Sequence, residues 1–380
     1  MGPMATPRLR VGLVGAGEVT QVIHLPALSL LSHLYTIEAV CDISKKNAEH
    51  CAAKFHIPKA STNAYDVIND SAVDVVFVLT SDEFHEQYVV AALNAGKKVF
   101  IEKPIALSVQ SAQRIADANR AAGGSRVFVG YMRRYAPSFW RAFKREIAGI
   151  DQILYARVRD FSGPNKSFVD QSGTFQVKNT DDIPSEAGAE RERLLDALFA
   201  EAFPGKPSTP ERRTLWRFLG SLGSHDISLM REVLGFPESI GGVSANGLFY
   251  SAILNFRNRG RGGDKGAPFA VTYESGIDSV PEFDAHLAVY GQNKRVSIHY
   301  DSPYVKGLPI KVRVAEVNAH GEFVTREMLS SYEDAYTAEL QEMHASFAQG
   351  RPIKTTPEDA LQDLRLFDMI ISKYEETVAA

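Results

Sequence analysis

Short apolar segments alternate with segments that can wind as helices over roughly the first 130 residues, and this alternation limits the possible folds more than any other feature. The strand-like segments lie at 10–14, 36–41, 73–80, 98–102 and 126–131. The helical segments lie at 18–31, 44–55, 65–68, 83–95 and 109–121. Because strands joined by helical crossovers run parallel, the pattern predicts a doubly wound parallel sheet, in which ligands bind at the carboxyl ends of the strands.

The pattern changes after about residue 131. A helix predicted at 138–147 is followed by longer strand-like segments at 153–161, 238–246, 249–256, 269–274, 284–290, 295–300 and 311–316. Strands that follow one another without intervening helices pair antiparallel. Helices at 332–348 and 357–376 follow, the second with Thr356 as its N-cap. We therefore expect an α/β chain with a Rossmann domain at 8–131 and an α+β domain at 132–380, built on a large, mostly antiparallel sheet.

Two polar segments interrupt the second half of the chain. Residues 162–210 carry a charged helical piece at 186–202 between flanks rich in Gly, Pro and Ser, which predicts an insertion or lid. Residues 258–266 are rich in Gly and Arg and could be an RNA-binding segment. A flexible hairpin loop is favoured there, because only nine residues separate two predicted strands.

Charge and composition exclude several classes of protein. The chain has 42 Lys and Arg against 46 Asp and Glu, a net charge of −4, so we expect no nucleic-acid partner. Its longest apolar run, 73–79, is far shorter than the roughly 20 residues that cross a bilayer, so we expect no membrane span. Two cysteines, Cys41 and Cys51, make neither a zinc set nor a disulfide framework, so no metal site is expected. The first ten residues lack the apolar region of a secretory signal, and we expect a cytoplasmic protein.

A glycine-rich turn lies between the first predicted strand and the first helix. Gly15 would permit the tight turn, and Gly17 would let the backbone approach a pyrophosphate at the positive end of the helix. Thr20 stands where a third glycine is usual, but that glycine serves packing and not phosphate contact. The predicted cofactor contacts in this turn are Gly15, Ala16, Gly17, Glu18 and Val19.

Asp42 follows the second strand, where a carboxylate can accept hydrogen bonds from the adenosine ribose. The same carboxylate repels a 2′-phosphate, which favours NAD as the cofactor. NADP stays possible, because Lys45 and Lys46 supply positive charge nearby. The alternative is that Asp42 only caps the next helix.

Lys103 follows directly on the strand 98–102, so its side chain is expected near the ligand crevice. Oxidising an alcohol with NAD requires a group that takes the hydroxyl proton. A free lysine has a pKa near 10.4 and cannot accept it, but burial and the positive nicotinamide ring would both lower the pKa of Lys103. Without this position in the fold, a Lys-Pro step would be an ordinary surface turn.

His225 lies near the start of a helix predicted to run to Leu234. Ser221, His225 and Ser228 are spaced so that they share one face of that helix, which could meet a bound substrate. His225 could orient the reacting hydroxyl or assist the proton relay. The alternative is a structural histidine.

These motifs together resemble the glucose-fructose oxidoreductase, inositol dehydrogenase and rhizopine-catabolism family. The resemblance is carried by Gly15-x-Gly17 with 24–26 (His-Leu-Pro), by 73–76 through Thr80 and His85, and by 95–99 leading into 102–104 (Glu-Lys-Pro). Residues 132–135 (Met-Arg-Arg-Tyr) and Gly223-x-His225 extend it. It covers nearly the whole chain and is strong to residue 145.

The resemblance implies a role for each matching residue. Lys103 would be the catalytic acid/base and His225 its substrate-side partner. The implied cofactor site adds Asp42, Thr80, His85, Glu102 and Lys103 to the glycine turn, and the implied substrate contacts are Arg133, Ser221 and Asp226. The family also implies a sugar, polyol or cyclitol substrate and a homodimer or homotetramer.

One departure leaves the substrate open. Many family members carry aspartates four residues before and three residues after the histidine, where this chain has Ser221 and Ser228. Asp226 cannot simply replace them, because adjacent residues point about 100° apart on a helix. Inositol specificity is therefore not predicted.

Three functions remain in competition. The favoured one is an NAD-dependent dehydrogenase that transfers hydride between the cofactor and a secondary alcohol or ketone. The others are a non-catalytic NAD-binding sensor, as in the yeast galactose-pathway repressor, and a redox-assisted epimerase or eliminase. The residues Glu102, Lys103 and Pro104 argue against the sensor, since a sensor needs no proton carrier.

Overall fold

The computed structural model describes residues 7–259 and 266–379, which form two compact units. The first unit consists of the chain up to Tyr131 together with Thr174–Ser208 and Glu339–Leu364. The second consists of Met132–Gly173, Thr209–Ala338 and the chain from Arg365 onward. The predicted insertion at 162–210 is thus shared between the units. Most of the predicted loop at 258–266 lies outside the described residues.

The first unit contains a six-stranded parallel sheet with strand order β3-β2-β1-β4-β5-β6. The chain leaves β1 toward one edge and returns to β4 on the other side of β1, so the strand order reverses between these two strands. This is the switch point at which doubly wound sheets bind ligands. The strands are β1 (Leu9–Val14), β2 (Tyr35–Cys41), β3 (Lys59–Ser61), β4 (Val75–Val78), β5 (Lys98–Glu102) and β6 (Val127–Gly130).

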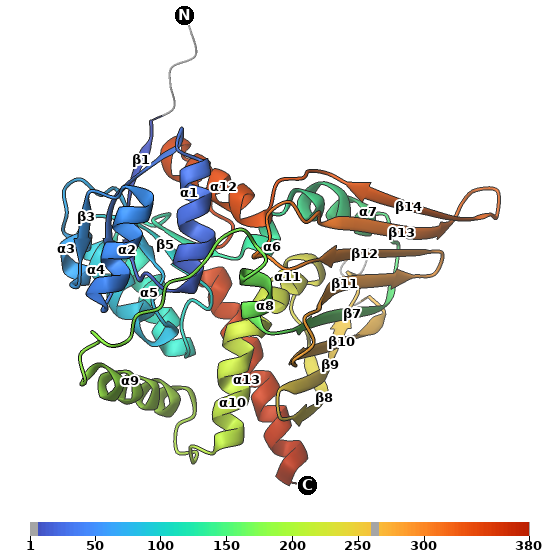
Figure 1. Ribbon diagram of the computed structural model, residues 1–380. Coiled ribbons are helices and arrows are strands. Elements are labelled where there is room, and N and C mark those ends of the chain that lie inside the picture. Colours follow the sequence, from blue (N-terminus) through green and yellow to red (C-terminus); the bar gives the residue numbers. More distant parts are fainter. Residues whose placement is uncertain (1–6, 260–265, 380) are drawn as a thin grey trace, which may run out of the picture. The chain divides into compact units, whose positions relative to one another are not determined.

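Crossover helices connect these strands as the alternation predicts (Figure 1). The expected first helix contains a π-helical turn, η1 (Thr20–His24), before α1 (Leu25–Leu30). The others are α2 (Lys45–Phe55), α3 (Ala64–Ile68), η2 (Asp82–Phe84), α4 (His85–Asn94) and α5 (Val109–Ala121). Ser44, Asn63 and Ser108 cap α2, α3 and α5, each accepting a hydrogen bond from a backbone N–H of the first turn.

Two later segments complete the first unit. Helix α9 (Ala187–Ala202) is joined to the parallel-sheet domain by ion pairs from Arg114 to Glu201 and from Arg191 to Glu83. The segment Glu339–Leu364 supplies the carbonyl of Thr355, which accepts a hydrogen bond of 3.0 Å from the Val129 amide. Part of this segment belongs to α12 (Ala335–Gln349).

The second unit contains an eight-stranded sheet with strand order β14-β13-β12-β11-β7-β10-β9-β8, an order that the labels of Figure 1 follow. Every pair is antiparallel except β10 with β7. The expected large, mostly antiparallel sheet is confirmed. The strands are β7 (Ile153–Ser162), β8 (Ser239–Asn246), β9 (Phe249–Arg257), β10 (Pro268–Ile277), β11 (Phe283–Gly291), β12 (Lys294–Tyr300), β13 (Lys311–Val317) and β14 (Phe323–Leu329).

The central strands of this sheet alternate between buried and half-buried residues, so one face is packed in the core of the unit. The helices of the unit are α6 (Met132–Tyr135), η3 (Ser138–Phe143), α7 (Lys144–Ala148), α8 (Asn165–Val169), α10 (Pro210–Phe218), η4 (Leu219–Gly223), α11 (Ser224–Leu234) and most of α13 (Pro357–Ala379). No helix in the described part of the chain is both long and apolar enough to cross a bilayer.

Candidate functional site

Gly15 begins the turn between β1 and η1 in a conformation that favours glycine, with φ of +106°. A Cβ atom placed on Gly15 would lie 2.6 Å from the carbonyl oxygen of Leu79 and 2.8 Å from the carbonyl carbon of the same residue. The Gly15 amide donates a hydrogen bond of 2.8 Å to the Cys41 carbonyl. The fold of the first unit therefore requires glycine at this position.

Gly17 differs from Gly15, because the fold gives no reason for a glycine there. The residue is exposed, and a Cβ atom on it would meet no protein atom within 4 Å. Thr20, at the position of the usual third glycine, is buried and donates a hydrogen bond of 2.7 Å to the Gly15 carbonyl. Thr20 thus closes the turn from within, while the space beside Gly17 is open to a ligand.

A cavity of about 300 Å³ opens beside this turn within the first unit. It lies between the ends of β1, β2 and β4, at the switch point of the sheet. Its volume is in the range of small-molecule sites. Its lining is mainly apolar with a few polar groups: Val14, Gly15, Gly17, Cys41, Asp42, Ile43, Thr62, Ala64, Leu79, Thr80, Ser81, Phe84 and Tyr88.

Asp42 lines this cavity and joins the glycine turn to the start of α2. One carboxylate oxygen accepts a hydrogen bond of 2.8 Å from the Ala16 amide, and the other accepts one of 2.9 Å from the Ser44 amide. The N-cap of α2 is Ser44 and not Asp42, so Asp42 holds the residue before the helix and also lines the candidate ligand site. Its contact with a ribose stays a prediction.

His85 is buried and connects the segments that follow β4 and β5. Its Nδ1 lies 2.8 Å from the Pro104 carbonyl oxygen, and its Nε2 lies 3.1 Å from that of Thr80. This arrangement gives His85 a positioning role for Thr80, which lines the cavity. A direct contact between His85 and a cofactor stays a prediction, and it would require the ring to leave these carbonyls.

Glu102 ends β5 and forms a buried pair with His24, whose Nε2 lies 2.8 Å from Oε1. The other oxygen of Glu102 accepts a hydrogen bond of 3.1 Å from the Lys103 amide. The His24 ring also packs edge-on against Phe77 and Phe100. His24, whose role was not predicted beyond the family motif, thus fixes the side chain beside Lys103.

Lys103 is half-buried at the carboxyl end of β5 and is followed by a cis peptide bond to Pro104. The backbone around it is held on both sides, by Glu102 at the Lys103 amide and by His85 at the Pro104 carbonyl. The structure therefore places Lys103 just after the carboxyl end of β5, but Lys103 does not line the cavity beside the glycine turn. Its catalytic role stays a prediction.

The predicted histidine helix lies in the second unit. Ser221 is exposed in the middle of η4, and His225 is half-buried near the start of α11. Ser228 is buried, and its hydroxyl donates a hydrogen bond of 3.2 Å to the His225 carbonyl. Ser228 therefore does not present its hydroxyl to a ligand beside Ser221 and His225, as the spacing predicts, because this hydroxyl is bound to the backbone of its own helix.

Arg133 and Asp226, both predicted substrate contacts, form a buried cluster with Asp160. Their exposed fractions are 3% for Arg133, 2% for Asp226 and 0% for Asp160. Nη1 of Arg133 lies 3.0 Å from Asp160 and also pairs with Asp226. Burial raises the pKa of Asp226 well above its usual range, and the neighbouring Asp160 acts in the same direction. This geometry gives Arg133 and Asp226 a structural role, and their contact with substrate stays a prediction.

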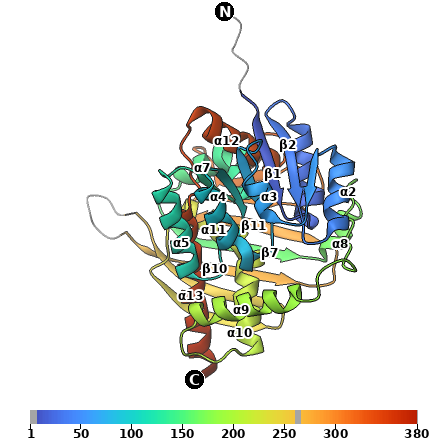
Figure 2. The same ribbon diagram turned by 90° about the vertical axis from the view of Figure 1, so that its left-hand side faces the viewer.

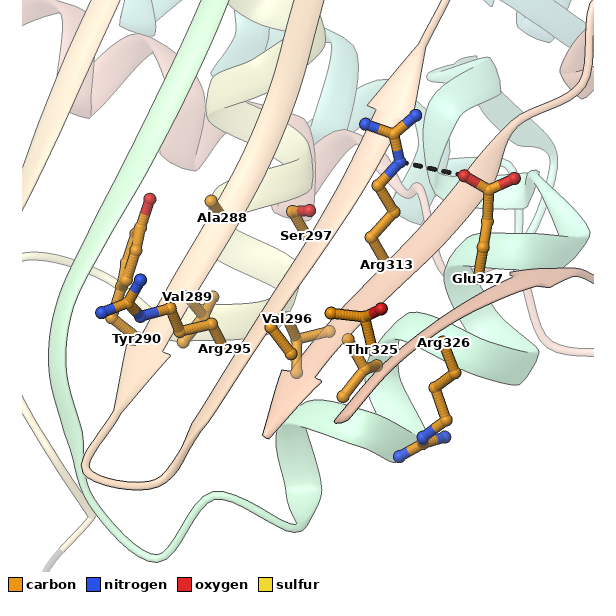
Figure 3. A pocket seen from close by; sticks show the side chains of 12 residues that line it. Ala288, Val289, Tyr290, Arg295, Val296, Ser297, Arg313, Thr325, Arg326 and Glu327 are labelled. Carbon is orange, nitrogen blue, oxygen red and sulfur yellow. Dashed lines mark hydrogen bonds and ion pairs between the residues drawn. The ribbon is translucent and has the colours of Figure 1, made fainter. Parts of the chain in front are cut away.

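A larger cavity, of about 470 Å³, lies over β11–β14 in the second unit (Figure 3). Two of its lining residues form an ion pair, which Figure 3 marks with a dashed line: Nε of Arg313 donates a hydrogen bond of 2.9 Å to Glu327. None of the predicted site residues lines this cavity. Among residues 7–259 and 266–379, no cluster of His, Cys, Asp or Glu is arranged to hold a metal ion. The cavity beside the glycine turn is lined by the predicted cofactor contacts Gly15, Gly17, Asp42 and Thr80 and is therefore the candidate cofactor site.

Residues 9–131 match the model of an oxidoreductase family with an NAD-binding Rossmann fold, the family of glucose-fructose oxidoreductase, inositol dehydrogenase and the rhizopine-catabolism protein. The likeness to this family is thus shown for these residues, which form the parallel-sheet part of the first unit. The inositol 2-dehydrogenase of Paracoccus denitrificans is 36% identical over 156 residues, 40% of this chain and 46% of that enzyme. The match thus spans less than half the length of this curated relative.

Solved structures share the fold over nearly the whole chain. A levoglucosan dehydrogenase in complex with NADH and levoglucosan superposes with a TM-score of 0.71 at 15% identity, covering 97% of this chain and 98% of that one. A 3-ketoreductase from Actinomadura kijaniata in complex with TDP-benzene and NADP gives a TM-score of 0.70 at 16% identity, with coverage of 97% and 98%. At this identity the likeness shows the fold alone, and one of the two structures contains NADH and the other NADP.

Proposed function

We propose that this protein is an NAD-dependent oxidoreductase that transfers hydride between the cofactor and a secondary alcohol or ketone of a sugar, polyol or cyclitol. The observation that carries the proposal is Gly17, a glycine that no protein atom requires, at the mouth of a cavity at the switch point of the sheet. Because Gly17 has no side chain, the pyrophosphate of a dinucleotide could come close to the protein backbone there. The match of residues 9–131 to an NAD-binding family supports the same reading.

The residues of the cavity fit a dinucleotide. Gly15 and Gly17 would allow the pyrophosphate to approach the backbone at the start of η1, and Asp42 would accept hydrogen bonds from the adenosine ribose. Ile43, Phe84 and Tyr88 offer apolar surface for a base. NAD bound there would supply the hydride acceptor. We propose NAD as the preferred cofactor, because the Asp42 carboxylate disfavours a 2′-phosphate.

Lys103 is proposed as the catalytic acid/base. Its Nζ would take the hydroxyl proton when the substrate is oxidised and return it when the ketone is reduced. Glu102 and His85 would act as positioning residues, because they hold the backbone on both sides of Lys103. His225 is proposed as the substrate-side partner in the second unit, with Ser221, Arg133 and Asp226 as further candidates for substrate contacts.

The substrate class follows from the relatives. Inositol 2-dehydrogenases and a levoglucosan dehydrogenase are named for a cyclitol and a sugar derivative. We propose a substrate of this polyhydroxylated class. Ser221 can donate or accept a hydrogen bond to a hydroxyl without carrying charge, which suits such a substrate.

We also propose a cytoplasmic protein with domains at 8–131 and 132–380 that assembles as a homodimer or homotetramer. The half-buried face of the eight-stranded sheet supports self-association, because Phe249 and Ile253 on this face of β9 leave 37% and 50% of their surfaces exposed. Buried thiols at Cys41 and Cys51, whose pKa values burial raises to about 12 and about 11, suit a reducing compartment. Sedimentation analysis would test the assembly, and a monomer at micromolar concentration would contradict it.

The function is tested with purified protein in two steps. Calorimetry measures binding of NAD and NADP, and nicotinamide absorbance is then followed with a panel of sugars, polyols and cyclitols. A dehydrogenase binds NAD and reduces it with at least one compound of the panel. Binding without absorbance change on any compound favours the sensor, whereas an altered sugar without net absorbance change indicates an epimerase or eliminase. Failure to bind either dinucleotide would contradict all three.

A further inference from the structure

A strap formed by residues 175–182 runs beside α2 in the first unit before the chain enters α9 (Figure 1, Figure 2). The strap contains no helix or strand of its own. Val177 pairs with the side chain of Gln21, donating a hydrogen bond of 2.9 Å to Oε1 and accepting one of 2.9 Å from Nε2. The same Gln21 amide donates to the carbonyl of Ala16, at 2.7 Å. The strap is thus attached directly to the glycine turn.

Two further contacts fix the strap along α2. The Asn179 amide donates a hydrogen bond of 2.8 Å to the side chain of Asn47, which in turn donates one of 3.2 Å to the Asn179 carbonyl. The ammonium of Lys54 lies 3.6 Å from the centre of the Phe175 ring. The start of the strap is thus held at the last turn of α2, and its later part at the first turn.

The strap ends in two carboxylates that occupy the start of α2. Asp182 accepts a hydrogen bond of 2.7 Å from the Ser44 hydroxyl and one of 2.9 Å from the Lys46 amide. Asp181 pairs with the Lys46 ammonium at 2.5 Å. These contacts lower the pKa values of both carboxyl groups, so both are ionised at neutral pH.

The groups that hold these carboxylates are the ones a phosphate would use. A helix N-terminus with free amides, a hydroxyl and a lysine is a ready anion site. Ser44 lies next to the predicted ribose contact, because its amide donates to the Asp42 carboxylate. NADP differs from NAD by a phosphate on the 2′-oxygen of that ribose. In this protein, the Ser44 hydroxyl, the Lys46 amide and the Lys46 ammonium are already bound by Asp181 and Asp182.

We propose that Asp181 and Asp182 are specificity-determining residues that occupy the 2′-phosphate position at the start of α2 and thereby exclude NADP in favour of NAD. This inference rests on the proposed function, since it assumes a dinucleotide at the glycine turn. It assigns a role to part of the insertion, which carries negative charge to a position that Lys45 and Lys46 would otherwise make attractive to phosphate.

The test is the double variant Asp181→Asn/Asp182→Asn, which removes both charges with little change in side-chain size. At position 182 one oxygen remains to accept a hydrogen bond from either the Ser44 hydroxyl or the Lys46 amide. Dissociation constants for NAD and NADP are measured by calorimetry at low salt. Close like charges cost several kcal/mol, so affinity for NADP should rise at least about tenfold. Affinity for NAD should stay within about threefold of the wild-type value. Asp181→Asn alone, at an exposed residue, should give part of the gain.

Two controls separate the possible explanations. Glu190→Gln removes one negative charge from the same insertion, where Glu190 pairs with Arg193 on α9, and should leave both affinities unchanged. Adding Lys46→Ala to the double variant should remove most of the gain, because Lys46 would then be missing as a phosphate partner. An unchanged ratio of NADP to NAD affinity in the double variant would overturn the inference while leaving NAD binding intact. A wild-type protein that binds neither dinucleotide would instead overturn the proposed function.

Discussion

Replacing each of the two turn glycines by alanine should separate folding from ligand binding. In Gly15→Ala, the backbone at φ +106° becomes strained, which costs about 1–3 kcal/mol. The new Cβ atom also lies 2.6 Å from the Leu79 carbonyl oxygen, and such overpacking costs about 1–3 kcal/mol more. The free energy of unfolding should therefore fall by roughly 2–6 kcal/mol, which lowers the melting temperature by roughly 5–15 °C.

Gly17→Ala should behave in the opposite way. No protein atom lies within 4 Å of the new Cβ atom, so the free energy of unfolding should change by no more than about 0.5 kcal/mol. The methyl group would, however, stand where the pyrophosphate approaches the backbone, and NAD affinity should fall by about tenfold or more.

Thermal unfolding and calorimetric NAD titration of both variants measure the two effects. Wild-type protein and Gly188→Ala, a substitution on α9 where a Cβ atom also meets no protein atom within 4 Å, are the controls. NAD affinity equal to wild type in a stable Gly17→Ala protein would refute the assignment of the pyrophosphate site. A Gly15→Ala protein as stable as wild type would refute the argument from the turn geometry.

Two further predictions concern single carboxylates. Asp42→Ala should narrow the ratio of NAD to NADP affinity, as measured by titration, and an unchanged ratio would mean that other residues discriminate. Glu146 forms ion pairs with Arg326 and Lys294. Hydrogen bonds, first of all from Arg326, lower the pKa of Glu146 from 4.5 to about 2. The stabilising effect of the Glu146 carboxylate is therefore present above pH 4.5 and is lost as the pH falls toward 2. Glu146→Gln should therefore lower the free energy of unfolding, measured with urea at pH 7, by roughly 1–3 kcal/mol. The free energy of unfolding of the variant should also fall less steeply than that of the wild type below about pH 4.5. Parallel curves of the free energy of unfolding against pH for the two proteins would contradict this.

The sequence predicts the parts of this fold that repeat a strong local pattern. The buried strands β1, β2, β4, β5 and β6 were all expected, because apolar residues dominate each of them. The edge strands β3 and β14 were missed, because β3 has only three residues and both consist largely of exposed or half-buried positions. Their pairing comes from the neighbouring strand and not from a hydrophobic pattern of their own.

The candidate site was predictable only where one short segment carries the chemistry. The glycine turn and Lys103 can be recognised beside their strands, because position at a strand end is a local property. The pairings of His24 with Glu102 and of Arg133 with Asp160 and Asp226 join residues far apart in the chain, which no spacing rule identifies. The same holds for Asp182, which lies 138 positions from Ser44. The composition of residues 162–210 predicts a polar insertion, but it does not indicate that the insertion would contact the start of α2.

The most direct test of the central claim is the rate of hydride transfer in Lys103→Ala at saturating NAD, measured on whichever sugar or cyclitol the wild-type protein oxidises. Loss of a general acid/base should slow turnover by roughly 10² to 10⁴ while the dissociation constant for NAD stays near the wild-type value. A variant that turns over at the wild-type rate would show that another group exchanges the proton, and would contradict the role assigned to Lys103.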